Sequence, residues 1–195
     1  RIGVYSDTAG TSAGDIYIGS VEVRKVFPRE PVRVNVTSPY YGNIFGGAEE
    51  KKFDVSFENL IDDKLDTTVT YNIVDEAGQI IKEGVINRTP DMVAETVQLD
   101  FSDITKYGLY EFNITTTVDF ELNGEKKQAV SEKCIEFSVI NKSDINERNQ
   151  NQNVCTHGAR GLWPAEPTLD IAAWAGFGGV RDEIMWENIE TSKGQ

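Results

Sequence analysis

Features that mark several classes of protein are scarce or missing in this sequence. It contains only two cysteines, Cys134 and Cys155, which are too few for a disulfide-stapled scaffold. No apolar run approaches the roughly 20 residues that a membrane-spanning helix needs, so we expect no membrane span. The sequence has no P-loop, HExxH or paired CxxC motif. We therefore expect no cofactor, and no catalytic or metal centre of those kinds.

Positive charge is also in short supply. The chain carries 19 Lys and Arg residues against 32 Asp and Glu residues, for a net charge of −13. Binding to nucleic acid needs a basic face for the phosphates, and this balance argues against it. Solubility explains the acidity; the alternative is calcium, with oxygens from Asp62, Asp63 and Asp66. Because these acids lack EF-hand spacing, we assign no metal site.

The first 27 residues leave two interpretations open. The chain starts with Arg1 rather than Met, and its opening lacks a charged-then-apolar signal pattern, so we expect a piece of a longer protein. Residues 13–25, AGDIYIGSVEVRK, resemble the last strand of a jelly-roll carbohydrate-binding module. Residues 1–27 are thus either the terminal strand of a preceding jelly-roll-like module or the first strand of the domain that follows.

Residues 28–141 contain a series of short runs in which apolar and polar side chains alternate. Examples are VRVNVT, KFDVSFEN, TVTYNIVD, VAETVQLDF and LYEFNITTTVDFEL. Turn residues separate the runs at the spacing of a β-sandwich. In VAETVQLDF we expect Val93, Val97, Leu99 and Phe101 on one face. Each run keeps one polar face for solvent, which predicts antiparallel rather than parallel sheets.

Three local signals refine this sandwich. The turn Asp75-Glu76-Ala77-Gly78 predicts one hairpin, and Asn123-Gly124, which suits a type I′ turn, predicts another. The segment DITKYGLYEF has the form of a tyrosine corner, with Tyr110 bonded to upstream backbone and Phe112 in the buried position that follows. The domain therefore resembles an immunoglobulin-like or fibronectin-like sandwich. The alternative is an ordinary strand with an exposed Tyr110.

The pattern changes after the polar residues 142–152, which we interpret as a linker. In residues 153–195, NVCTH and FGGVRDEI read as short strands on either side of a helix, LDIAAWAG, with Gly176 as its C-cap. Strand, helix and strand form a βαβ unit. Such a unit does not cover both of its faces, so we expect it to open a larger α/β domain.

The segments NVCTHGARG and LDIAAWAGFGGVRDEIMWENIETSKG resemble the start of a (β/α)8-barrel glycoside hydrolase, of the family 39 or family 5 kind. The resemblance implies that Arg181 braces a nucleophilic carboxylate and that His157 and, more weakly, Trp186 line the sugar subsite. Active sites of barrels lie at the carboxyl ends of the strands, where His157 and Arg181 are expected. In that clan the catalytic carboxylates follow the fourth and seventh strands, so the resemblance assigns no catalytic residue here and excludes Glu183, Glu187 and Glu190 as the pair.

Taken together, the sequence predicts a mainly β chain: an immunoglobulin-like antiparallel sandwich followed by a βαβ stub of a truncated (β/α)8 barrel. The expected function is a non-catalytic accessory domain of a secreted, extracellular glycoside hydrolase acting on poly- or oligosaccharide. One alternative is a carbohydrate-binding module, for which Tyr40, Tyr41 and Phe45 form the candidate sugar platform. The other interpretation of these rings is that they are buried and anchor their loop. The other is an extracellular adhesion-type sandwich. The stub is expected to contact the remainder of the barrel or a second copy of the chain.

Overall fold

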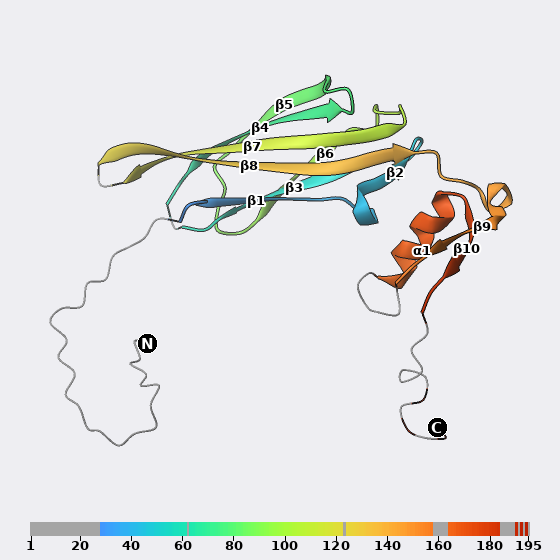
Figure 1. Ribbon diagram of the computed structural model, residues 1–195. Helices are drawn as coiled ribbons and strands as arrows, with labels where there is room; N and C mark the ends of the chain where they lie inside the picture. Colours follow the sequence, from blue (N-terminus) through green and yellow to red (C-terminus); the bar gives the residue numbers. More distant parts are fainter. Residues whose placement is uncertain are drawn as a thin grey trace, which may run out of the picture.

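The chain folds into a β-sandwich followed by a small α/β unit (Figure 1). This computed structural model describes residues 28–61, 63–122, 124–157, 164–183, 190, 192 and 194. The expectations for residues 1–27, Asp62, Asn123, Ile184 to Ile189 and therefore Trp186 and Glu187 lie outside the described residues. The described part is mainly β, as predicted.

The smaller sheet of the sandwich has three antiparallel strands in the order β1-β3-β6. They are β1 (Val32–Thr37), β3 (Lys52–Asn59) and β6 (Glu95–Asp100). The alternation in the sequence reappears as burial, because every second residue of β3 from Phe53 onward is buried. Val93 is a correction: it is 78% exposed and precedes β6, because the chain there bends to bring the carbonyl of Asp91 to the N–H of Asn59 (3.1 Å).

The larger sheet has five strands in the order β2-β8-β7-β4-β5. Its strands are β2 (Ile44–Gly46), β4 (Asp66–Asp75), β5 (Ile80–Arg88), β7 (Gly108–Leu122) and β8 (Glu125–Ile140). All pairs are antiparallel except that of β2 with β8, which is parallel. This exception arises because a 3-10 turn, Tyr41–Asn43, carries the chain from the edge of one sheet to the edge of the other.

Both predicted hairpins are present. Gly78 has a φ of +77° and its N–H donates to the carbonyl of Asp75 (2.9 Å) at the β4–β5 turn. Leu122 lies opposite Glu125, which leaves a two-residue connection between β7 and β8. Gly124 in that connection has a φ of +81°, a left-handed conformation that glycine adopts at little cost.

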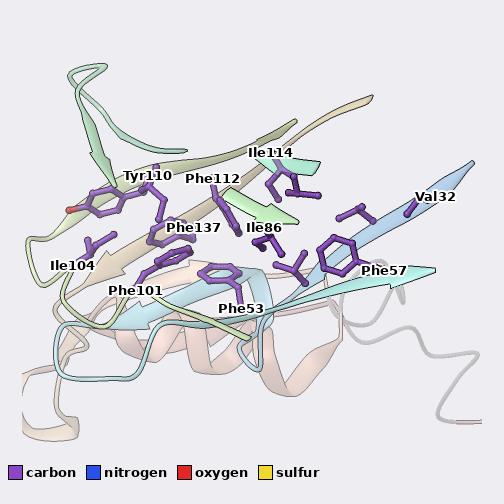
Figure 2. Packing of buried hydrophobic residues seen from close by; sticks show 14 of the residues in the cluster. Val32, Phe53, Phe57, Ile86, Phe101, Ile104, Tyr110, Phe112, Ile114 and Phe137 are labelled. Carbon is purple, nitrogen blue, oxygen red and sulfur yellow. The ribbon is translucent and has the colours of Figure 1, made fainter. Parts of the chain in front are cut away.

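The inner faces of the two sheets enclose an aromatic-rich core (Figure 2). The ring of Phe53 lies 5.4 Å from the centroids of both Phe112 and Phe137, so side chains of both sheets meet there. Tyr110 is buried, and its hydroxyl donates to the carbonyl of Lys106 (2.6 Å). With Phe112 buried two residues later, the predicted tyrosine corner is confirmed.

The start of β1 and the end of β8 lie at opposite ends of the sandwich (Figure 1). Early in β1, the carbonyl of Val34 accepts a hydrogen bond from Lys133; after β1, Asn43 donates to the carbonyl of Glu136 (3.0 Å). The chain therefore enters on the side of the sandwich from which the β7–β8 hairpin extends, and it advances along β8 in the direction in which β8 runs. It leaves from Ile140 at the far end, where the α/β unit follows.

The α/β unit consists of β9 (Asn149–Cys155), α1 (Ala165–Trp174) and β10 (Phe177–Arg181). The two strands are parallel, as the βαβ prediction required. Both β9 and α1 begin four residues earlier than the sequence pattern indicated; Pro167 is tolerated because it falls in the first helical turn. The helix ends as predicted, with Gly176 at a φ of +87°.

Candidate functional site

The carboxyl ends of β9 and β10 carry the two residues that the sequence singled out. Arg181 is the last residue of β10 and lies opposite Cys155. The N–H of Thr156 donates to the carbonyl of Arg181 (2.8 Å), so the pairing extends one residue past β9. His157 follows directly. The structure therefore brings His157 and Arg181 to neighbouring strand ends.

The surroundings of these two side chains differ. His157 lines a cavity of about 260 Å³ at the end of β9, beside Thr168, Ile171 and Ala172 of α1. Arg181 is exposed and is not among the residues lining that cavity. An imidazole and a guanidinium offer hydrogen bonds to hydroxyl or carboxylate oxygens. Both side chains can therefore bind or orient a ligand.

The acidic residues Asp182 and Glu183 follow β10 directly. The N–H of Glu183 donates to the carboxylate of Asp182 (2.7 Å).

The three aromatic residues of the candidate sugar platform differ in their exposure to solvent. Phe45 is fully buried in the core, so its ring is not available for stacking on a sugar. Tyr40 is half-buried and packs edge-on against Phe45, with ring centroids 5.2 Å apart. Tyr41, at 41% exposure, keeps an accessible ring. The platform is thus reduced from three aromatic residues to Tyr41.

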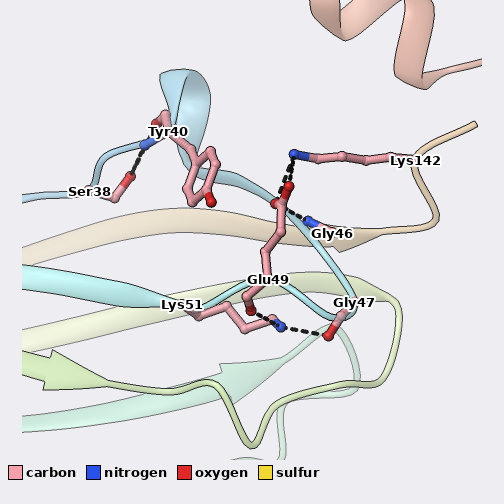
Figure 3. A network of polar contacts seen from close by, with 7 residues as sticks. All are labelled: Ser38, Tyr40, Gly46, Gly47, Glu49, Lys51 and Lys142. Carbon is pink, nitrogen blue, oxygen red and sulfur yellow. Dashed lines mark hydrogen bonds and ion pairs between the residues drawn. The ribbon is translucent and has the colours of Figure 1, made fainter.

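A polar cluster between the sandwich and the α/β unit was not anticipated from the sequence (Figure 3). Lys142 Nζ lies 2.8 Å from both carboxylate oxygens of Glu49 in the β2–β3 loop. The same ammonium lies 3.8 Å from the ring centroid of Trp174 in α1 and 5.0 Å from that of Tyr40. The sequence pattern placed Lys142 in a polar linker, and no periodicity marks it as a contact residue.

The loop that carries Glu49 is held from within. Lys51 is fully buried, and its Nζ donates to the carbonyls of Gly47 (2.8 Å) and Glu49 (2.7 Å). Burial lowers the pKa of Lys51, although Glu49 opposes this. Burial alone raises the pKa of Glu49, but the N–H of Gly46 and the ammonium of Lys142 outweigh it and hold that pKa below its ordinary value.

The described residues carry neither a metal-binding cluster nor a membrane-spanning helix. There, no three or more His, Cys, Asp or Glu side chains gather in a way that would hold a metal ion. Asp66, one of the three calcium candidates, instead accepts a hydrogen bond from Thr89 (3.0 Å). Over the same part of the chain, no helix has the length and apolar character needed to cross a membrane. Cys134 and Cys155 are free and exposed.

Comparison with known proteins assigns no family. No family model matches the sequence, and no curated protein is detectably similar to it. A solved CARDB domain of the PF1109 protein from Pyrococcus furiosus, in complex with di-metal ions, shares 22% identity over 56% of this chain and 87% of that one, with a TM-score of 0.36. A family 2 glycosyl hydrolase from Bacteroides cellulosilyticus shares 12% identity over 67% of this chain, with a TM-score of 0.34.

The matches also reach proteins of a different kind. The match with the glycosyl hydrolase covers only 19% of that protein's chain. The alkylpurine DNA glycosylase AlkC of Pseudomonas fluorescens, bound to DNA with an abasic site analog, shares 14% identity over 56% of this chain and 30% of its own, with a TM-score of 0.29. Scores this low establish neither a common family nor a common function.

Proposed function

We propose that this sandwich is a non-catalytic accessory domain that spaces and buttresses a C-terminal (β/α)8 barrel in a secreted glycoside hydrolase. The observation that carries the proposal is the parallel β9–α1–β10 unit with His157 and Arg181 at its strand ends. In this role Arg181 braces the nucleophilic carboxylate, and His157 and Trp186 line the sugar subsite. The substrate class is a poly- or oligosaccharide.

The route of the chain supports the spacer role. The chain enters the sandwich at the start of β1, on the side from which the β7–β8 hairpin extends. It leaves from the end of β8, at the opposite end of the sandwich (Figure 1). Chain ends at opposite poles keep a preceding and a following module apart, whereas many domains have adjacent termini.

The exposed surface of the α/β unit supports a larger barrel. Parallel sheets are normally covered on both faces. Here Leu169 of α1 is 45% exposed and Val180 of β10 is 42% exposed. In the proposal these side chains are covered by the remainder of the barrel or, in its absence, by a second copy of the chain.

The purified 195-residue chain allows a direct test of the accessory role. We expect no turnover of aryl-glycosides above that of the Glu183→Gln variant, and no retention on a panel of insoluble polysaccharides. Turnover that Glu183→Gln abolishes would overturn the non-catalytic assignment. Retention that Tyr41→Ala abolishes would favour the alternative of a sugar-binding module, because Tyr41 has the accessible ring.

Sedimentation tests the barrel surface separately. We expect the chain to self-associate with rising concentration, and Leu169→Lys to weaken that association. The matched control is Leu109→Lys, at a residue of β7 that is 48% exposed on the sandwich. A monomer at all concentrations, or equal effects of both variants, would argue against a barrel surface on α1.

A further inference from the structure

We propose that Lys142 is the central residue of a joint that fixes the orientation of the α/β unit on the sandwich. The joint consists of Tyr40, Glu49, Lys142, Ser143 and Trp174. This inference goes beyond the proposed function and does not depend on it, since it concerns how two parts of the chain are held together whatever the second part does.

One ammonium group joins three separate segments. Lys142 Nζ contacts both oxygens of Glu49 at 2.8 Å and lies 3.8 Å above the centre of the Trp174 ring. Tyr40 adds a second ring at 5.0 Å. Exposed ion pairs contribute little to stability. This side chain is only 16% exposed, and a cation–π contact strengthens as the cation loses water.

The sandwich side of the joint is rigid. The carboxylate of Glu49 also accepts a hydrogen bond from the N–H of Gly46 (2.6 Å), which orients it toward Lys142. Beneath it, Lys51 binds the carbonyls of Gly47 and Glu49 and so holds the whole β2–β3 loop (Figure 3). The anchor for Lys142 is therefore in place without any contribution from the α/β unit.

The α/β side is tied to the same short segment by its backbone. The N–H of Ser143 donates to the carbonyl of Trp174 (3.0 Å), and the N–H of Asn149 donates to that of Gly176 (2.9 Å). Between them, Asp144 and Glu147 form a capping box around a 3-10 turn, Ile145–Glu147. The segment between β8 and β9 is thus a structured connection, and we infer that sandwich and α/β unit move as one body.

The two native cysteines provide the measurement. Cys134 lies in β8 and Cys155 in β9, and both are free and exposed. Spin labels on them report the distance between the two units by pulsed electron resonance. We expect a narrow distance distribution in the unaltered chain. Lys142→Met keeps a side chain of similar length but loses the charge, and it should broaden the distribution. We expect the population of alternative orientations to rise about tenfold through loss of the cation–π contact and ion pair.

Matched variants separate the joint from general loss of charge. Lys127→Met removes a lysine at the hairpin tip, where its ion pair with Glu125 is 3.6 Å long, and should leave the distribution narrow. Trp174→Leu tests the contact from the other side and should broaden it with Lys142 intact. Circular dichroism checks that each variant folds. A distribution already broad in the unaltered chain, or one that neither Lys142→Met nor Trp174→Leu changes, would overturn the proposal.

Discussion

The hydroxyl of Tyr110 shows how one polar atom closes the end of a sandwich. It donates to the carbonyl of Lys106 at 2.6 Å while the ring stacks on Phe137 at 5.1 Å. Burial, with Asp75 and Glu76 nearby, raises the pKa of this phenol, so it stays protonated as a donor further into alkaline solution than an exposed tyrosine does.

Tyr110→Phe removes that donor and leaves the carbonyl of Lys106 without the hydrogen bond from this hydroxyl. We expect a loss of about 1–1.5 kcal/mol in the free energy of unfolding, the net value of a typical hydrogen bond. Denaturant titration measures the loss. The control is Tyr107→Phe, at a tyrosine that is 56% exposed. Equal stability of the two variants would show that the corner does not contribute.

Glu49 gives the sandwich a predictable response to acid. Its folded-state pKa lies below its ordinary value of 4.5. Its stabilising effect is therefore complete above the ordinary value and is lost as the pH falls through the lowered one. We expect Glu49→Gln to be less stable than the unaltered chain at neutral pH, with the difference shrinking in acid. A difference that grows in acid would reverse the assigned direction.

At the scale of elements, the β9–β10 pair depends on a glycine. A Cβ on Gly178 would lie 2.6 Å from the carbonyl oxygen of Asn149 and from Cα of Gln150, closer than such atoms approach. Here the strand register shifts, between Phe177 and Gly179, and the two backbones come into direct contact.

Gly178→Ala should therefore separate the two strands, at an overpacking cost of about 1–3 kcal/mol. Hydrogen exchange of the β9 and β10 amides measures this as faster exchange confined to the α/β unit. The control is Gly108→Ala, where an added Cβ would meet the Tyr110 ring at 3.9 Å, an ordinary contact. Unchanged exchange in Gly178→Ala would mean that the pair has more room than its geometry indicates.

Over the whole molecule, burial is distributed unevenly. The sandwich buries the side chains of both inner faces in one core. Within the described residues 149–157 and 164–183, by contrast, Thr156 and Ala172 are the buried ones. Because burying one large apolar side chain contributes about 1.5–3 kcal/mol, the α/β unit gains far less from folding than the sandwich does.

We therefore expect the α/β unit to open before the sandwich unfolds. Hydrogen exchange across a temperature series should show β9, α1 and β10 losing protection while β3, β4 and β7 retain theirs. Equal protection in both parts, in a sample that sedimentation shows to be monomeric, would contradict this order.

Much of the fold was determined by the sequence alone, because the information was local. Alternation in β3 and β4 marked their buried faces, and Gly78 and Gly124 marked the hairpin turns. Tyr110 and Phe112 marked the corner through their spacing within one strand. Each of these signals depends on residues close together in the chain, where backbone geometry decides the outcome.

Only the tertiary structure decided which distant segments meet. The sequence left open whether Phe45 belongs to a sugar platform or anchors its loop, and its contacts with Phe53 and Phe137 place it in the core. The sequence pattern places Lys142 in a polar linker, yet its side chain contacts Glu49, which is 93 residues away in the chain. Periodicity reports which face of a strand is apolar. It does not report which remote group will lie opposite, because that depends on how whole elements pack.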